Sequence, residues 1–194
     1  MRINIPWRRE QRYFDRAPWH KTIAQAGGGT LITQGSHFLD IVLWALGERP
    51  ISAFGITKNP GFDVEVETLA QAIVETEAGT LISITSSMET AREQAVSIEM
   101  YGDKGIARYR NLPYPAVKFS GVRSPKQPPP ERGIHALQRS LAGFAHWVLD
   151  DEPYLIPAAE TLPVLATIEA IYRSAASGKR EAVRQRQTSA QRGN

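Results

Sequence analysis

The most promising chemical group in the sequence is His37, a histidine between a glycine-rich turn and an apolar helix. Glycines occupy positions 27–29, Asp40 follows His37 by three residues, and residues 41–46 are apolar up to Gly47. This pattern predicts a tight turn, a helix that begins near His37 and a stop at Gly47. An imidazole at the mouth of a helix can act as an acid or a base near neutral pH. The alternative is a half-buried histidine with a structural hydrogen bond.

A second group of useful side chains lies in the first twenty residues, where aromatic and basic residues are interleaved. Aromatic rings can bind the face of a sugar, and arginine forks can bind carboxylate or phosphate. The alternative is a solvated helix over residues 9–15 whose aromatic side chains pack onto the protein body. The side chains concerned are those of Trp7, Arg8, Arg9, Arg12, Tyr13 and Trp19.

The glycines at positions 27–29 do not resemble a dinucleotide-binding loop. No strand is predicted before them, and the spacing G-x-G-x-x-G is absent from the sequence. Their predicted role is to let the backbone turn tightly into the helix that carries His37.

The composition describes one ordinary globular domain. The chain has 194 residues, enough to bury a sizeable core without metals or disulfides, and it contains no cysteine. The lack of cysteine excludes thiolate metal sites and a cysteine nucleophile, and it is compatible with a reducing cytoplasm. No secretory leader is recognisable, and no apolar run approaches the ~18 residues that span a membrane. We therefore expect a soluble, cytoplasmic protein without a membrane partner or a metal site.

The basic charge is concentrated at the C-terminal end. The formal net charge is +3, yet residues 179–194 alone contribute +4, so residues 1–178 carry a net charge of −1. A basic tail is poor evidence that the folded body binds nucleic acid. Nucleic-acid binding through the tail is the weakest of the functions considered, and no nucleic-acid partner is expected.

Alternating apolar and polar residues predict a sheet of five or six strands. Residues 67–87 read as a hairpin around a turn at residues 77–79, and residues 95–110 read as a second hairpin. Such short connections favour antiparallel pairing. The expected strands cover residues 2–6, 51–58, 67–76, 80–87, 95–101 and 106–110.

A proline-rich loop and two helices in the second half of the sequence complete the predicted domain. Residues 112–132 contain six prolines and are expected to form a long surface loop. Helical spacing of apolar residues predicts one helix over residues 133–150 with a core face, and another over residues 157–176 that ends at Gly178.

The predicted fold class is α+β, an open, mostly antiparallel mixed sheet with helices packed on one face. The other face would be partly apolar and free to pair with a second subunit. It would carry either Ile82 and Ile84 or Leu81 and Ser83. Residues 1–183 are expected to form this domain, and residues 184–194 a disordered basic tail.

From about residue 3 to residue 180, the sequence resembles the carboxy-terminal domain of the Gfo/Idh/MocA oxidoreductases. The most specific part is the motif G-x-H-x-x-D, made by Gly35, His37 and Asp40, in register with the glycines upstream. The segments that carry the resemblance are NIPW-RR-QRYFD, PW-KT, GGGTLITQGSHFLDIVLWALGE, VEVETLAQAIVETEAGTLISITSS, IEMYGDKGIARY and IEAIYRSAASGK.

This resemblance implies one half of a two-domain enzyme that oxidises sugars, sugar nucleotides or cyclitols. The other half would be a Rossmann domain that binds NAD or NADP, and without it the chain alone is expected to bind no cofactor and to be inactive. This half would supply the substrate pocket and, through the open sheet face, the contacts of a homo-oligomer. The alternative is a non-catalytic dimerisation or ligand-sensing module derived from the same domain.

By position, the resemblance implies that His37 is the catalytic acid or base. Thr33 lies four residues earlier, where relatives often carry Asp or Asn, and its hydroxyl can bond to substrate or imidazole but supplies no negative charge. The residues expected to contact a sugar-like substrate are Thr33, Gln34, Trp7, Arg9, Tyr13, Trp19 and Lys21.

Overall fold

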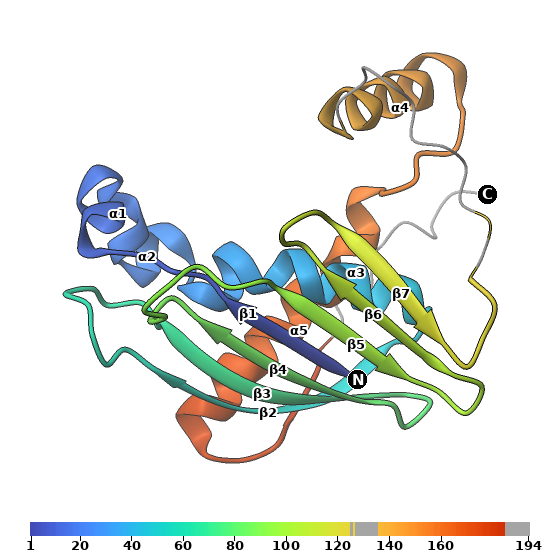
Figure 1. Cartoon of the computed structure of the whole chain (residues 1–194). Helices are drawn as coiled ribbons and strands as arrows, with labels where there is room; N and C mark the ends of the chain where they lie inside the picture. The colour runs from blue at the N-terminus through green and yellow to red at the C-terminus, as the bar shows by residue number, and fades with distance from the viewer. Residues whose placement is uncertain (125, 127–135, 185–194) are drawn as a thin grey trace.

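Residues 1–124, 126 and 136–184, which the computed structural model describes, are organised around a mixed sheet of eight strands (Figure 1). The strand order is β7-β6-β5-β1-β4-β3-β2-β8, in which β1 and β4 are parallel and every other neighbouring pair is antiparallel. The strands are β1 (Arg2–Pro6), β2 (Pro50–Lys58), β3 (Leu69–Thr76), β4 (Leu81–Ser87), β5 (Ser97–Tyr101), β6 (Ile106–Arg110), β7 (Ala116–Ser120) and β8 (Glu181–Ala182).

The prediction of five or six strands is wrong because neither β7 nor β8 has a sequence pattern that predicts a strand. β7 interrupts the long loop expected over residues 112–132. The prolines at 113 and 115 precede it, and it adds to the edge of the sheet beside β6, where a strand tolerates proline at its ends. β8 has two residues, too few to show a period, and it pairs with β2. The proline run at 128–130 and the predicted tail from residue 185 onward lie outside the described residues.

Two helices cover the inner face of the sheet. β3 and β4 alternate buried and exposed residues, as their sequence pattern predicts. α3 (Ser36–Leu46) and α5 (Ala158–Ser177) pack on the buried side, behind the sheet in Figure 1. α5 approaches β2 so closely that a Cβ at Gly55 would lie 2.6 Å from Ile171 Cγ2. The resulting core includes Ile3, Ile5, Leu39, Val42, Ala70, Val74, Ile82, Ile84, Ile168 and Ile171.

The outer face of the sheet carries exposed apolar side chains. Of the two possibilities for β4, the structure places Ile82 and Ile84 in the core and Leu81 and Ser83 outside. Leu81 is 57% exposed, and Ile73 on the adjacent strand is 52% exposed. Several exposed apolar side chains on one sheet face are typical of an interaction surface. We call this surface the outer-face patch; it consists of Phe54, Ile56, Ile73 and Leu81.

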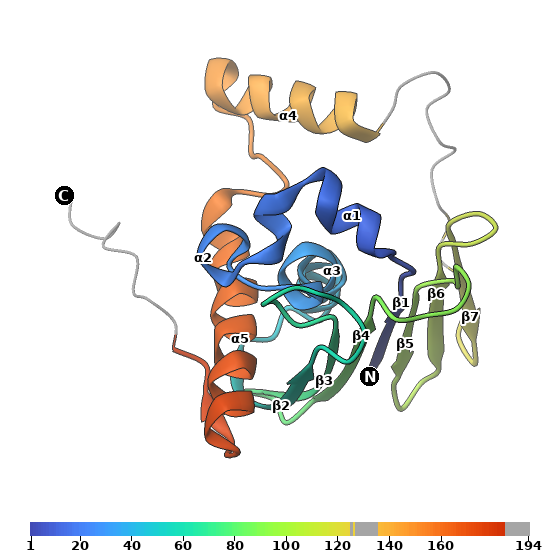
Figure 2. The ribbon, with the colours of Figure 1, turned by 90° about the vertical axis from the view of Figure 1, so that its left-hand side faces the viewer.

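The prediction that residues 133–150 form a helix with a core face is wrong. The helix, α4 (Ala136–Asp150), stands away from the sheet in Figures 1 and 2, and Leu141 and Val148 of its apolar stripe are 60% and 61% exposed. Tyr154 packs on it and hydrogen-bonds to Ser140 at 2.9 Å between the hydroxyl oxygens. An apolar stripe shows that a helix has a face to cover, but not what covers it. Residues 133–135 lie outside the described residues.

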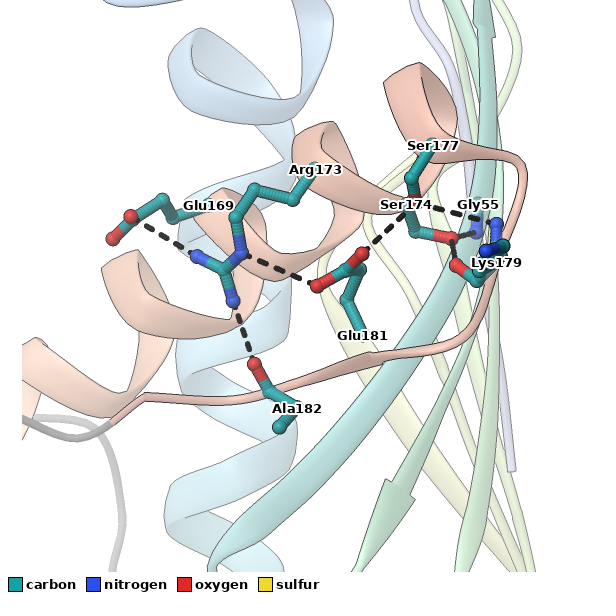
Figure 3. A network of polar contacts seen from close by, with 8 residues as sticks. All are labelled: Gly55, Glu169, Arg173, Ser174, Ser177, Lys179, Glu181 and Ala182. Atoms are coloured by element: carbon teal, nitrogen blue, oxygen red, sulfur yellow. Dashed lines mark hydrogen bonds and ion pairs between the residues drawn. The ribbon is translucent and has the colours of Figure 1, made fainter.

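A polar network attaches the C-terminal end of α5 to the sheet (Figure 3). The helix ends at Gly178, where φ is +68° and the amide donates to the Ser174 carbonyl, as the predicted glycine stop requires. The Ser174 hydroxyl accepts a hydrogen bond from the Gly55 amide of β2 at 3.0 Å. Arg173 donates to the Ala182 carbonyl of β8 at 2.6 Å. These bonds hold the last turns of α5 against β2 and β8.

Candidate functional site

His37 lies inside a helical segment rather than at its start. Helical backbone begins at Thr30, passes through a π-helical turn, η2 (Leu31–Gly35), and continues into α3. The hydroxyls of Thr33 and Ser36 donate to the carbonyls four residues earlier, at 2.8 and 2.7 Å. Such bonds often bend helices, and π turns are frequent at functional sites. The helix start predicted near His37 is confirmed for α3, which begins at Ser36, but α3 continues a helical segment that already begins at Thr30.

The His37 side chain is exposed to solvent. It makes no hydrogen bond, ion pair or ring contact with the described part of the chain, which differs from the half-buried, hydrogen-bonded histidine of the structural alternative. An imidazole in this setting is open to a ligand and can exchange a proton with a hydroxyl placed beside it.

Glu67, two residues before β3, holds the start of this helical segment. Its carboxylate accepts hydrogen bonds from the Gly29 amide at 2.6 Å, the Leu31 amide at 2.9 Å and the Tyr172 hydroxyl at 2.9 Å. A carboxylate in this position satisfies amides that have no partner within the helix and compensates the positive end of the helix dipole. Burial raises the pKa of Glu67 above its ordinary value of 4.5, against its hydrogen bonds, which lower it. Burial and the Glu67 carboxylate raise the pKa of the Tyr172 phenol, which therefore remains a donor.

Close contacts require the glycines before this helix. A Cβ at Gly28 would lie 2.1 Å from the Tyr172 hydroxyl oxygen, and a Cβ at Gly29 would lie 1.7 Å from the Glu67 carbonyl oxygen. Gly27, with φ of +76°, ends α2 (Ile23–Ala26) in the left-handed conformation. The glycines therefore turn the chain into the helix, as the sequence predicts.

NAD and NADP do not fit at this turn. In a phosphate-binding loop the free amides at a helix start point at the ligand, whereas here the Gly29 and Leu31 amides are bonded to Glu67. Tyr172 fills the space beside Gly28. A pyrophosphate would meet a carboxylate where it needs donors. No residue of this turn is therefore assigned to a dinucleotide.

Thr33 and Gln34, two of the predicted substrate residues, are engaged with the protein. The Thr33 hydroxyl bonds to the Gly29 carbonyl. Gln34 is 2% exposed, and its Oε1 accepts a hydrogen bond from the Thr30 hydroxyl at 3.0 Å. The Gln34 amide nitrogen is buried without a hydrogen-bond partner among the described residues. Contact of these two residues with a substrate stays a prediction.

Four other predicted substrate residues meet in one stack beside α1 (Gln11–Arg16). The Arg9 guanidinium carbon lies 4.9 Å from the ring centres of both Trp7 and Tyr13, which is cation–π geometry. The Tyr13 and His20 rings stack with centroids 4.6 Å apart, and the His20 and Trp19 centroids are 3.5 Å apart. We call these five residues the aromatic stack.

The aromatic stack is fixed to the body and reaches the helix of His37. Phe14 of α1 is buried in a small second core with Val66 and Met88. On the other side, the Trp7 ring lies edge-on to Phe38, the residue after His37, with centroids 6.5 Å apart. Figure 1 shows that β1 leads into α1 at the left-hand end of the sheet, which is also the end at which the helical segment leading into α3 begins. The stack and the histidine-bearing helix therefore border the same end of the sheet.

His20 and Lys21 belong to a short helical turn, η1 (Pro18–Lys21), that closes the stack. Burial, and secondarily the charge of Arg9, lower the pKa of His20 below its ordinary value of 6.5. Lys21, a predicted substrate residue, pairs with Asp15 at 2.7 Å and thereby holds the pKa of that carboxyl below its ordinary value. Its role at a substrate stays a prediction.

Glu67, Tyr172 and His20 are site residues that sequence reasoning missed. Glu67 and Tyr172 both lie in segments that carry the family resemblance, but they are 105 positions apart and no sequence pattern shows that they meet. The run of glycines is a usable signal, because glycines beyond the one needed for the turn imply crowded neighbours.

Among the described residues, the site therefore offers an exposed imidazole, stacked aromatic rings and a fixed guanidinium. These groups suit proton transfer to a hydroxyl and the binding of a polar ligand with flat faces, such as a sugar. No group of three or more His, Asp and Glu side chains in the described ranges could hold a metal ion. No described helix is both long and apolar enough to cross a membrane.

Known proteins share this architecture. The sequence profile of the GFO/IDH/MocA C-terminal domain matches residues 1–108. The WlbA dehydrogenase from Bordetella pertussis, solved with NADH and UDP-GlcNAcA, is 26% identical with a TM-score of 0.80, and the match covers 94% of this chain and 54% of that one. The aldose-aldose oxidoreductase from Caulobacter crescentus, solved with glycerol, is 20% identical with a TM-score of 0.76, covering 93% and 54%. No curated protein sequence is significantly similar to the chain.

The fold of this chain, an open mixed sheet with helices on one face, matches about half of each of these oxidoreductase chains. The chain belongs to the GFO/IDH/MocA family and corresponds to its C-terminal domain. It spans about half the length of the solved structures that it matches.

Proposed function

We propose that the chain is the substrate-binding and oligomerisation domain of an NAD(P)-dependent dehydrogenase of sugars, sugar nucleotides or cyclitols. The observation that carries the proposal is His37, which is exposed, lies within the motif G-x-H-x-x-D and precedes Phe38, the contact of Trp7 of the aromatic stack. The Bordetella relative, solved with NADH and a sugar nucleotide, supports this class of reaction.

In this proposal His37 accepts the proton of a substrate hydroxyl while the carbon that bears it is oxidised. Imidazole suits the task because its ordinary pKa lies near neutrality. The hydride acceptor is a nicotinamide held by a domain outside this sequence, because Glu67 and Tyr172 occupy the glycine turn of this chain. The chain alone then binds neither NAD nor NADP and oxidises no sugar.

The outer-face patch supports the second part of the proposal, a homo-oligomer. An open sheet face with exposed Phe54 and Ile73 directly opposite each other on β2 and β3 is suited to packing on a copy of itself. The exposed fractions of the two side chains are 41% and 52%, so pairing would remove substantial apolar area from water.

Calorimetric titration and a domain fusion test the proposal together. Titration of the chain with NAD and NADP is expected to show no binding, and micromolar binding would contradict it. Fusion behind an NAD-binding domain of the same family is expected to give NAD reduction with at least one sugar, sugar nucleotide or cyclitol. A folded fusion that binds NAD and these ligands but oxidises none of them would favour the non-catalytic sensing module.

A further inference from the structure

A pocket of about 340 Å³ opens beside α1, on the basic side of the aromatic stack. Four arginines, one glutamate and Tyr13 make most of its wall, and we call it the arginine pocket. Its charged residues are Arg8, Arg9, Glu10, Arg12 and Arg16. No assigned residue of the proton-transfer chemistry lies in it.

The arginine pocket has an unbalanced positive charge. Glu10 is its single acidic lining residue, and it pairs with both Arg8 at 2.5 Å and Arg12 at 2.8 Å. Arg9 and Arg16 have no acidic partner among the described residues. The lining therefore carries a net charge of +3, although residues 1–178 as a whole are at −1. Four guanidinium groups around one hollow repel one another unless an anion joins them.

Arg9 is built into the pocket rather than free on the surface. Its guanidinium lies between the rings of Trp7 and Tyr13, and its Nη1 donates to the Arg8 carbonyl at 2.9 Å. Its Nε is buried and has no hydrogen-bond partner among the described residues. A guanidinium that is already immobilised loses little further freedom when it binds an oxyanion, and a buried donor without a partner indicates a missing acceptor.

The pocket is connected to the helix of His37 through Trp7. The Trp7 ring lies under the Arg9 guanidinium and edge-on to Phe38, the residue after His37. A ligand anchored at the arginines by an anionic group would contact Tyr13, which lines the pocket and belongs to the aromatic stack.

We propose that the arginine pocket binds the diphosphate of a nucleoside diphosphate sugar. A lining charge of +3 and several forked donors match a diphosphate, which presents at least two negative charges, better than the single charge of a uronate carboxylate. This inference rests on the proposed function and narrows its three substrate classes to sugar nucleotides.

Titration calorimetry on the full chain tests the inference without any redox reaction. The probes are inorganic pyrophosphate, UDP, glucuronate and sulfate, at low and high salt. Pyrophosphate and UDP are expected to bind, more weakly at high salt, and at least about tenfold more tightly than glucuronate or sulfate. Equal affinity for all four would mean an adventitious ion only and would overturn the inference, as would tighter binding of glucuronate than of UDP.

Arginine variants locate the bound anion. Arg16→Gln and Arg9→Gln are each expected to weaken UDP binding by about tenfold, the size of one charge-assisted hydrogen bond. Arg110→Gln, an equal loss of charge at an exposed position of β6, is the matched control and is expected to leave the affinity unchanged. Arg16 is exposed, so its variant stays informative if Arg9→Gln fails to fold. Unchanged UDP binding by Arg16→Gln, or an equal loss with Arg110→Gln, would overturn the inference.

Failure of this inference and failure of the proposed function are distinguishable. If the fused enzyme oxidises neutral sugars or cyclitols and the chain does not bind pyrophosphate, only the proposal for the arginine pocket is overturned. If the chain binds pyrophosphate, Arg16→Gln abolishes this binding, and the fusion has no redox activity, the result supports the diphosphate site and contradicts the proposed dehydrogenase function.

Discussion

The Tyr172 hydroxyl donates a 2.9 Å hydrogen bond to the Glu67 carboxylate, although the two residues are 105 positions apart. The same carboxylate accepts the first amides of the helical segment that leads to His37. Tyr172 of α5 and Glu67 before β3 therefore hold the start of the helical segment that carries the candidate base. The Glu67 carboxylate also takes the place that a cofactor phosphate would need at the glycine turn.

Removal of the phenol hydroxyl should destabilise the domain. Tyr172→Phe deprives a half-buried carboxylate of a donor, and we expect the free energy of unfolding to fall by about 2 kcal/mol. Urea denaturation followed by circular dichroism measures the change. Tyr114→Phe, at a side chain that is 80% exposed, is the control and should be neutral. Equal stability of Tyr172→Phe and wild type would show that Glu67 does not need this donor.

The raised pKa of Glu67 predicts how its contribution to stability varies with pH. Because its pKa in the folded state lies above the ordinary 4.5, folding favours the protonated carboxyl. Its contribution to stability is therefore fully present below pH 4.5 and is lost as the pH rises through the folded-state pKa. The free energy of unfolding of wild type minus that of Glu67→Gln should accordingly fall from acidic to neutral pH. Urea denaturation of both proteins across this range measures it, and a difference that grows with pH would refute the assignment.

Close packing at the glycine turn should make Gly29 intolerant of any side chain. A Cβ there would lie 1.7 Å from the Glu67 carbonyl oxygen, so Gly29→Ala must displace main chain, and we expect a loss of about 3 kcal/mol or more. Gly102→Ala is the matched control, because its Cβ would meet only the Gly105 oxygen, at 3.6 Å. Thermal and urea unfolding of the two variants give the comparison. Similar stability of both would contradict the crowded turn.

Local sequence patterns predict most of the strands and helices but few of the contacts at the candidate site. The period of two in β3 and β4 predicts the hairpin and the existence of two faces, yet only packing decides that Ile82 faces inward and Leu81 outward. The apolar stripe of α4 predicts a helix. It does not predict which part of the protein packs on that stripe, because this depends on the tertiary structure. β8 is too short to have a pattern.

At the site, sequence reasoning finds residues that are close along the chain or lie in one motif. Trp7, Arg9 and Tyr13 come together as their interleaving suggests. Glu67 and Tyr172 are missed because their meeting depends on how α5 lies on the sheet. The glycines at positions 28 and 29 are the only local sign of this contact, because a side chain at either position would clash with Tyr172 or Glu67.

The outer-face patch predicts a homo-oligomer that a single charged substitution in the patch should dissociate. Ile73→Lys puts an ammonium group into the middle of an apolar surface, and we expect sedimentation velocity to show an oligomer for wild type and monomers for the variant. Leu141→Lys, at a comparably exposed apolar position on α4, is the control and should leave the assembly intact. A monomeric wild type, or an oligomer that survives Ile73→Lys, would contradict this role of the sheet face.

The role of His37 is tested most directly by steady-state kinetics of the chain fused to an NAD-binding domain. His37→Ala should lower kcat by about 10²- to 10⁴-fold while KM changes little, because the exposed imidazole acts in proton transfer more than in binding. His146→Ala, at an exposed histidine of α4, serves as the control and should keep wild-type turnover. Loss of kcat in His37→Ala alone is the predicted result, and a His37→Ala enzyme that turns over at the wild-type rate would contradict the account.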